Sequence, residues 1–522
     1  MTKPIVVGTP TFRDIIEGGF LYVDKTEAIY PLVRYPKGIY FFARPRRFGK
    51  SLTVSTLKEI FIGNKELFRG LWLYQSDYDW QAYPVLRFDF SKERVDSAER
   101  MIDTLKSYLE DIAYEYDISL QEGPPERQFR WLIQQLARAH QGKVVILIDE
   151  YDKPLIDNLD AIAAATEVRE ILRAFYGVIK AMDEQIRFVF ITGISKFSRV
   201  GIFSQMNHLT DLTMNPDFAT LVGITSEELQ RDFAEPIAAL AKRENLAVDA
   251  TLQKIRQWYN GFCFAAGADR LYNPFSLLNL FYQKRFSNYW FESGTPRFLV
   301  DLIRERRYPI QEFEGVKLPA TAFSTFELDK LEIVPVMFQT GYLTIKDYEP
   351  ATQRYTLAYP NDEVEDSFVT YLLSSFAHLD LKFSEEYLWR LIDALAIKDF
   401  KRFFTVVDTF FAQIPYDLHV DHEKYYQTVI YLIFLMMGFR IEAEVKTNQG
   451  RIDVVVELDN HIALFEFKLD GDEEAALQQI KTKEYFQKYW LKEKPIILVG
   501  VNFDSKHGKV AGWKTETQEV NG

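Results

Sequence analysis

Apolar runs and amphipathic stretches alternate between about residue 38 and residue 215. Four short runs are rich in aliphatic, aromatic and β-branched side chains and are bounded by polar residues: 38–42, 84–90, 143–149 and 187–193. Such runs predict buried β-strands. Apolar residues recur at helical spacing in the stretches between them: 52–61, 97–116, 128–140 and 167–182. Strands that alternate with helices predict an α/β fold, in which helices cover a parallel sheet.

The pattern changes after about residue 216, where helical spacing dominates as far as about residue 420. Residues 226–228 have the composition of a helix start. Residues 338–345 and 355–360 are extended in character, so they predict a hairpin. Helices are expected on its C-terminal side, at 364–377 and 385–396, and they leave a winged-helix arrangement open.

Strand patterns return after about residue 421. An apolar helical stretch at 425–437 precedes the predicted strands 441–445, 450–457, 461–468 and a closing strand at 495–501. These elements predict a second α/β domain. We therefore expect four parts, which are a lead-in over 1–37, a parallel α/β domain over 38–220, a mainly helical region over 221–420 and a C-terminal α/β domain over 421–522.

Composition narrows the functional classes. The chain has 522 residues, a net charge of −13 and 15% aromatic residues. A protein that bound nucleic acid over its whole surface would be basic, so any such contact needs a local patch or a bound cation. The aromatic residues predict large cores, and base stacking by some of them stays open. Cys263 is the single cysteine, which excludes an intramolecular disulfide and a cysteine-type zinc site.

The sequence predicts no membrane span and no secretory signal. No apolar run has the length of a membrane span, and the first residues lack the charged and apolar regions of a secretory signal. We therefore expect a cytoplasmic protein without membrane contact. The sequence leaves the oligomeric state open.

A loop with anion-binding chemistry joins the first predicted strand to the first long helix. Gly49 lets the backbone approach a phosphate closely, because it has no Cβ. Lys50 can reach the β- and γ-phosphates of a nucleotide, and the Ser51 hydroxyl can ligate Mg²⁺. The N–H groups and dipole of the helix start also favour an anion. The residues that we expect to bind the nucleotide in this loop are Arg44, Arg46, Arg47, Phe48, Gly49, Lys50, Ser51 and Leu52.

This loop departs from the general P-loop pattern G-x-x-x-x-G-K-[ST] at one position. The pattern begins with glycine, and Arg44 stands there. Taken alone, the run is also compatible with Lys50 as a solvated residue at a helix start. Arg46 and Arg47 are either cationic clamps on the phosphates or partners of nearby acids.

Two acids at the end of a later strand supply the second half of a nucleotide site. Asp149 lies at the carboxyl end of a central strand, where α/β folds bind ligands, so we expect it to hold Mg²⁺ directly or through water. Glu150 is placed to polarise the attacking water. Thr192, at the end of the next strand, is either a sensor of the γ-phosphate or a hydroxyl that simply ends a strand. Lys196 and Arg199 follow on a loop, where solvated charges are favoured over a role in the transition state.

A second chemical site is predicted in residues 421–522. Period-two alternation puts Glu466 and Lys468 on one face of a strand, and the hairpin partner can place Asp453 beside them. Two carboxylates can hold Mg²⁺ or Mn²⁺, and Lys468 can orient the attacking water or stabilise charge on a phosphate. The alternative is a surface strand with alternating charges.

These motifs in combination resemble a bacterial family of AAA-ATPase-like proteins. The run 44–51 follows Tyr22-Val23-Asp24-Lys25-Thr26, and further matches lie at 191–197, 258–262 and 272–274. In that family, arginine at the first P-loop position is usual. The resemblance implies ATP as the nucleotide, a P-loop sheet of the additional-strand class and a helical lid after it.

The C-terminal part is similar to the PD-(D/E)XK nucleases, a domain type that members of this family commonly carry. Asp453, a spacer of twelve residues and Glu466-x-Lys468 match that layout. Glu423 and Gln479 match the carboxylate and the glutamine that such nucleases often carry on neighbouring helices.

Three functional hypotheses follow. The first is an ATPase coupled to a metal-dependent nuclease that acts on DNA or RNA. The second is a nucleotide-controlled switch or scaffold whose C-terminal domain binds a partner without cleaving it. The third makes both sites inactive and assigns the aromatic-rich surfaces to a protein partner.

Overall fold

The computed structural model describes residues 3–140, 142–159, 161–196, 203, 206, 208–290, 299–300, 302–303, 306, 308, 310–323, 332–377, 381–412, 429–434, 440–447, 450–492, 494–504, 506–507 and 509–518. It divides into two compact units. The first unit holds Met1–Leu299 and Phe313–Val364, and the second holds Val300–Glu312 and Glu365–Gly522. Among the helices within the described ranges, none combines the length and apolar character that a bilayer crossing requires.

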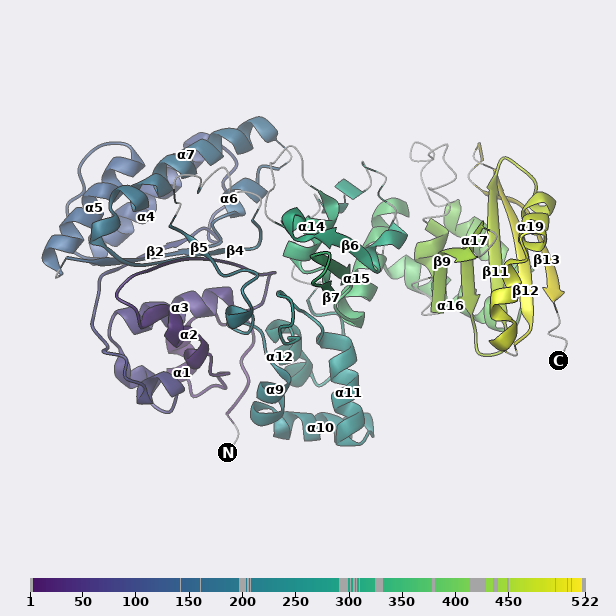
Figure 1. The fold of residues 1–522 in the computed structure, drawn as a ribbon, viewed down its shortest axis with the longest axis horizontal. Helices are drawn as coiled ribbons and strands as arrows, with labels where there is room; N and C mark the ends of the chain where they lie inside the picture. Colours follow the sequence, from purple (N-terminus) through teal and green to yellow (C-terminus); the bar gives the residue numbers. More distant parts are fainter. Residues whose placement is uncertain are drawn as a thin grey trace. The chain divides into compact units, whose positions relative to one another are not determined.

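A sheet of five parallel strands forms the centre of the first unit (Figure 1). Its strand order is β2-β3-β4-β1-β5. Strand β4 therefore lies between β1 and β3, which is the inserted strand of the additional-strand class, and the predicted fold class is confirmed. The bounds are Gly38–Ala43 (β1), Val85–Asp89 (β2), Val144–Asp149 (β3), Ile186–Gly193 (β4) and Thr210–Asp211 (β5).

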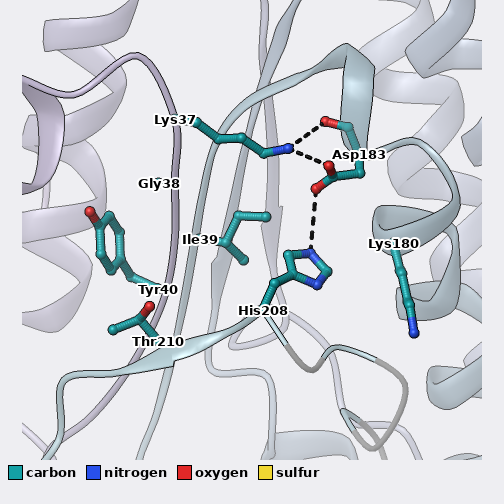
Figure 2. A pocket seen from close by; sticks show the side chains of 8 residues that line it. All are labelled: Lys37, Gly38, Ile39, Tyr40, Lys180, Asp183, His208 and Thr210. Carbon is teal, nitrogen blue, oxygen red and sulfur yellow. Dashed lines mark hydrogen bonds and ion pairs between the residues drawn. The ribbon is translucent and has the colours of Figure 1, made fainter.

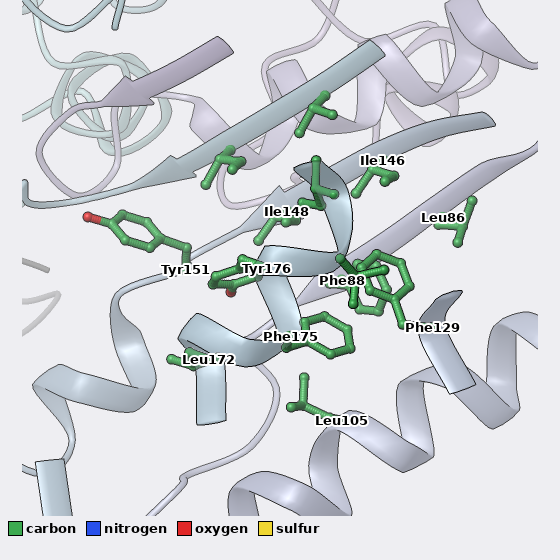
Figure 3. Close-up of a cluster of buried hydrophobic side chains, with 14 of the residues drawn as sticks. Leu86, Phe88, Leu105, Phe129, Ile146, Ile148, Tyr151, Leu172, Phe175 and Tyr176 are labelled. Atoms are coloured by element: carbon green, nitrogen blue, oxygen red, sulfur yellow. The ribbon is translucent and has the colours of Figure 1, made fainter. Parts of the chain in front are cut away.

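Helices cover both faces of this sheet, so its strands are buried on both faces. On one face, Phe88 packs with Phe129 and Phe175, whose rings stack with centroids 4.5 Å apart (Figure 3). On the other face, Phe188 contacts Phe61 at 4.6 Å between centroids. Full burial of one such side chain contributes about 1.5–3 kcal/mol to stability. The helices are Phe12–Glu17 (α1), Thr26–Val33 (α2), Lys50–Phe61 (α3), Ala98–Glu115 (α4), Pro125–Ala139 (α5), Lys153–Ile156 (α6) and Ile162–Ala181 (α7).

Within the described residues 226–283, four helices follow the sheet, as the helical spacing predicts. The first turn of the first of these helices is held by a capping box, in which Thr225 and Glu228 bond to each other's backbone N–H groups. Asn273 accepts hydrogen bonds from the N–H groups of Phe275 and Ser276, so it caps the last of these helices. The four helices are Ser226–Asp232 (α9), Ala234–Glu244 (α10), Val248–Tyr259 (α11) and Pro274–Gln283 (α12).

A small antiparallel sheet completes the first unit, in the order β6-β8-β7. The expected hairpin is present as Thr344–Glu349 (β7) and Arg354–Ala358 (β8), with Val316–Pro319 (β6) beside it. The predicted first strand began too early, because residues 338–340 belong to the helix Ile333–Thr340 (α14). Gly341 ends this helix with a φ of 91°, a left-handed conformation that favours glycine.

The second unit is built on a five-stranded sheet in the order β13-β12-β11-β10-β9. Strands β11 and β12 pair in parallel, and the other pairs are antiparallel. The strand at 495–501 was expected to close the domain, but β13 follows it at the sheet edge. The strand bounds are Arg440–Thr447 (β9), Gly450–Glu457 (β10), Ile462–Leu469 (β11), Ile496–Asp504 (β12) and Lys509–Gln518 (β13).

Helices accompany this second sheet, and one of them carries a predicted site residue. Helix α19 packs against β11 and β12 through Ala476, Leu477 and Ile480. The helices of this part are Asp362–Ala377 (α15, which begins in the first unit), Leu381–Ala396 (α16), Phe400–Phe411 (α17) and Glu473–Thr482 (α19), followed by the 3₁₀ segment Tyr485–Lys492. The four-part division of the chain stays a prediction.

Candidate nucleotide and metal sites

The predicted phosphate loop joins β1 to α3 at the carboxyl edge of the first sheet. Gly49 occupies the N-cap of α3 with a φ of 97°, a conformation that L side chains rarely adopt. Arg47, two residues earlier, also has a positive φ of 66°. Phe48 lies between these two residues, is fully buried and contacts Phe262 and Phe264 edge-on, so it anchors the loop. The free N–H groups of the first turn of α3 are the expected anion donors.

Asp149 is a buried carboxylate with the Ser51 hydroxyl beside it. Its side chain is 1% exposed, and neither carboxylate oxygen makes a hydrogen bond of standard geometry. Burial raises the pKa of Asp149 to about 6, and the nearby Ser51 hydroxyl offsets part of that shift. A buried acid with open lone pairs beside a hydroxyl offers the hard oxygen ligands that Mg²⁺ prefers, so these residues fit the ion.

Lys50 and Glu150 are brought together as the motif reading expects. The Lys50 ammonium lies 3.9 Å from a Glu150 carboxylate oxygen and donates a hydrogen bond to the Pro45 carbonyl at 3.1 Å. Lys50 is buried, so the alternative in which it is a solvated residue at a helix start is wrong. Glu150 has a φ of 54°, so a non-glycine residue is held in a strained conformation next to the site.

Thr192 lies where predicted, at the end of β4 and beside β1. Its buried hydroxyl donates a 2.7 Å hydrogen bond to the Phe42 carbonyl. This bond is what a hydroxyl at a strand end would make, and the sensor role stays a prediction.

The three loop arginines have different surroundings. The Arg44 guanidinium is buried and bonds to backbone carbonyls. Arg46 is half-buried, and Arg47 is exposed with its guanidinium 4.8 Å from the Phe275 ring centroid. Their expected roles in binding nucleotide remain predictions, as does that of Leu52.

Lys196 is not the solvated charge that was expected on its loop. It is buried, its ammonium lies 2.9 Å from an Asp211 carboxylate oxygen, and its N–H donates to the Gln339 side chain at 2.8 Å. The reason is that Asp211, at the end of the short strand β5, lies close enough to pair with it. Phe197 and Arg199 lie outside the described residues.

Two acids near the site were not singled out from the sequence. Asp89 stands opposite Asp149 in the β2–β3 register, and its charge adds to the rise in the pKa of Asp149. Asp152 is fully buried and accepts hydrogen bonds from the Ile194 and Ser195 N–H groups and from the Ser195 hydroxyl. The rule that found Asp149, an acid ending a parallel strand, would also have found Asp89.

A cavity of about 120 Å³ opens beside the first turn of α3. Gly49, Leu52 and Thr53 line it on the side of the phosphate loop. A second, more open cavity of about 610 Å³ lies at the amino end of β1, where Asp183 contacts both Lys37 and His208 (Figure 2). None of the predicted nucleotide-binding residues lines the second cavity. The remaining walls of the first are Val6, Gly8, Thr9, Ile15, Leu21, Tyr22, Val23, Lys25, Phe48, Leu221, Val222, Gly223, Ile224, Phe233, Pro274 and Leu278.

The predicted second site is assembled on β10, β11 and α19. Asp453 accepts a 2.9 Å hydrogen bond from the Phe467 N–H, which brings it beside Glu466 across the hairpin. The Lys468 ammonium lies 3.8 Å from Glu466 and donates to the Gln479 side-chain carbonyl at 2.8 Å. The Gln479 amide in turn donates to Glu466. Gln479 therefore bridges the acid and the base, and Glu423 lies outside the described residues.

Glu466 is a buried carboxylate that a bound cation would stabilise. It is 2% exposed, and one of its oxygens has no hydrogen-bond partner among the described residues. Burial and the neighbouring Asp453 charge raise the pKa of Glu466 to about 8. Within the described part of the chain, no three His, Cys, Asp or Glu residues form a complete metal-binding group. The two carboxylates fit a hard divalent ion whose other ligands come from water and substrate.

Comparison with known proteins identifies the families of both parts of the chain. Residues 6–203 match the family model described as "Predicted AAA-ATPase". A protein of Azotobacter chroococcum mcd 1, described as "Uncharacterized protein in vnfD 5'region", is 38% identical over 526 residues, which cover 99% of each chain. The chain belongs to the predicted AAA-ATPase family. The resemblance drawn from the motifs is thus confirmed, and residues 421–513 of this AAA-ATPase-like protein match the model of the PD-(D/E)XK nuclease superfamily.

Proposed function

We propose that this protein binds and hydrolyses ATP and that its C-terminal domain is a metal-dependent nuclease acting on nucleic acid. The observation that carries the proposal is the Asp149 carboxylate, which is buried beside Ser51 and makes no hydrogen bond of standard geometry to the described residues. Such a group costs stability unless a ligand completes it. Its position, at the end of β3 and beside a P-loop lysine, supports Mg²⁺ with a nucleoside triphosphate as that ligand.

The chain's own groups have separate tasks in this proposal. Lys50 and the first-turn N–H groups of α3 bind the phosphates, which requires the ammonium to leave the Pro45 carbonyl. Glu150 accepts a proton from the attacking water, and Ser51 and Asp149 hold the ion. Mg²⁺, when bound, neutralises charge that develops on the transferred phosphoryl group.

The 120 Å³ cavity supports a place for the nucleotide base. It adjoins Gly49 and Thr53, and its walls include the apolar side chains of Val23, Ile224 and Leu278. A flat, apolar ring face gains by burial in such a cavity. Residues from the lead-in, from α3 and from the helical region would then share one ligand.

The nuclease half rests on Asp453, Glu466 and Lys468. The two carboxylates would hold Mg²⁺ or Mn²⁺, and the ion would lower the pKa of a bound water. Lys468 would stabilise the charge on the scissile phosphate. Gln479 would keep Lys468 and Glu466 in register through its two hydrogen bonds.

Two assays test the halves separately. ATP binding is measured by calorimetry, and hydrolysis by phosphate release, with Glu150→Gln as the variant expected to bind but not turn over. Cleavage is tested on supercoiled and linear DNA and on RNA with Mg²⁺ or Mn²⁺. If no condition gives cleavage, and the Asp453→Ala protein behaves as the wild type does, the nuclease half is wrong.

A nucleotide-controlled switch is the second candidate, and one observation favours it. Residues well beyond the sheet hold the phosphate loop, because the Trp290 indole donates to the Arg46 carbonyl at 3.3 Å and Phe48 packs on Phe262. A nucleotide that moved the loop would move these contacts too. A change of oligomeric state on adding ATP, without turnover, would support the switch in light-scattering measurements.

A further inference from the structure

Arg44 fills the position where the general P-loop pattern has glycine, and its side chain is 1% exposed. One terminal nitrogen donates to the carbonyls of Ala43 at 2.9 Å and Thr213 at 2.6 Å. The other reaches the Phe218 carbonyl at 3.5 Å. The guanidinium therefore ties the first loop residue to the chain that follows β5.

Two aromatic rings enclose the same guanidinium. Its central carbon lies 4.3 Å from the Phe42 ring centroid and 4.4 Å from that of Phe264. Both distances are within the range of a cation–π contact, which strengthens when the cation is desolvated. Arg44 thus connects β1 with the loop after α11 as well.

All of these partners are electrically neutral. Among the described residues, Arg44 makes no ion pair: the charge of Asp211 raises the pKa of Arg44, but the Asp211 carboxylate pairs with Lys196. Burial lowers the pKa of Arg44 to about 9, so the group still carries its charge at neutral pH. A buried cation that is held by carbonyls and ring faces gains further stabilisation when an anion binds nearby.

The backbone of Arg44 connects this cation to Lys50 of the phosphate loop. The Arg44 N–H donates to the Gly193 carbonyl at 3.1 Å, which fixes the start of the loop against β4. The carbonyl of the next residue, Pro45, accepts the hydrogen bond from the Lys50 ammonium. The place of residue 44 therefore sets the place of the group that holds Lys50.

We propose that Arg44 is a positioning residue of the nucleotide site, which fixes the start of the phosphate loop and supplies a buried positive charge that bound phosphates compensate. The inference rests on the proposed nucleotide binding and adds a role to it. It replaces the expectation that Arg44 contacts the nucleotide itself, because the guanidinium is committed to carbonyls and rings on the protein side.

The test compares Arg44→Met, Arg44→Lys and a matched control, Arg187→Met. Arg187 is also a buried arginine of this sheet, with its guanidinium bonded to the Val33 carbonyl at 2.7 Å and 5.6 Å from the Phe61 and Tyr83 ring centroids. It lies at the amino end of β4, away from the phosphate loop. The readouts are the Kd for a non-hydrolysable ATP analogue with Mg²⁺ and the melting temperature of each ligand-free protein, with Kd measured well below that temperature.

We expect both methionine variants to melt at lower temperature, because each loses a buried hydrogen-bonded group. Only Arg44→Met should weaken analogue binding, by about tenfold or more, because it removes both the buried charge and the hydrogen bonds that fix the start of the loop. Arg44→Lys, which keeps the charge, should bind more tightly than Arg44→Met.

Three results would overturn the inference: Arg44→Met binding as the wild type does, Arg187→Met losing as much affinity, or Arg44→Lys binding no better than Arg44→Met. A wild-type protein that binds no nucleotide would remove the proposed function together with the inference. An unaffected Arg44→Met variant would remove the inference alone.

Discussion

Replacing Asp149 with asparagine should stabilise the ligand-free protein and abolish its binding of Mg²⁺-nucleotide. The pKa of Asp149 is raised from 3.8 to about 6, mainly by burial. Because the folded-state pKa lies above the unfolded value, the ionised carboxylate destabilises the fold above about pH 6, and this cost disappears as the pH falls to about 4. A shift of this size corresponds to about 3 kcal/mol at neutral pH.

The assay is thermal unfolding of wild type and Asp149→Asn at pH 5 and pH 7.5. The variant should melt several degrees higher at pH 7.5, and the gap should narrow at pH 5. In the wild type, binding of Mg²⁺-nucleotide requires the ionised acid, so affinity should fall about tenfold between pH 7 and pH 5 as Asp149 protonates. A variant that melts lower at pH 7.5, or that still binds Mg²⁺-nucleotide as the wild type does, would refute this reading of Asp149.

Three further predictions concern the other contacts. Mn²⁺ binding to the C-terminal domain should tighten between pH 6 and pH 8 and release about one proton per ion, because the pKa of Glu466 is raised to about 8. Calorimetry in two buffers measures the proton release. A pH-independent affinity would count against Glu466 as a ligand. Asp453→Asn should weaken Mn²⁺ binding about tenfold or more, whereas Asp459→Asn, an exposed acid at the end of the same hairpin, should leave it unchanged. Gly193→Ala should destabilise the protein by about 1–3 kcal/mol or more, because the new Cβ would lie 2.3 Å from an Asp152 carboxylate oxygen. An unchanged melting temperature would show that the chain around Gly193 and Asp152 is free to shift.

The sequence was most informative where one residue type satisfies one local requirement. The apolar runs predicted β1 to β4 of the first sheet and β9 to β12 of the second, and the P-loop and Asp149-Glu150 marked the edge of the first sheet where we propose the nucleotide site. It failed for residues 338–340, the last turn of α14, because so short a segment has too little periodicity to separate the end of a helix from the start of a strand. It also missed strand β13, whose side chains are largely exposed at a sheet edge.

The surroundings of the charged groups could not be predicted, because they depend on partners far apart in the sequence. Lys196 was expected in solvent, and it pairs with Asp211 across the end of the sheet. Arg44 meets carbonyls of Thr213 and Phe218 and the ring of Phe264, none of which the local motif mentions. The sequence therefore indicated candidate site residues, and only the fold shows what holds them in place.

Nucleotide binding by Lys50→Ala is the measurement that tests the account most directly. Lys58, on the same helix but in its last turn, gives the matched control Lys58→Ala. We predict that Lys50→Ala loses about a hundredfold or more in affinity for ATP with Mg²⁺, as expected for a buried ammonium that binds phosphates, while Lys58→Ala stays within about twofold of wild type. If Lys50→Ala binds ATP as tightly as the wild type, the phosphate loop is not the nucleotide site and the central claim is wrong.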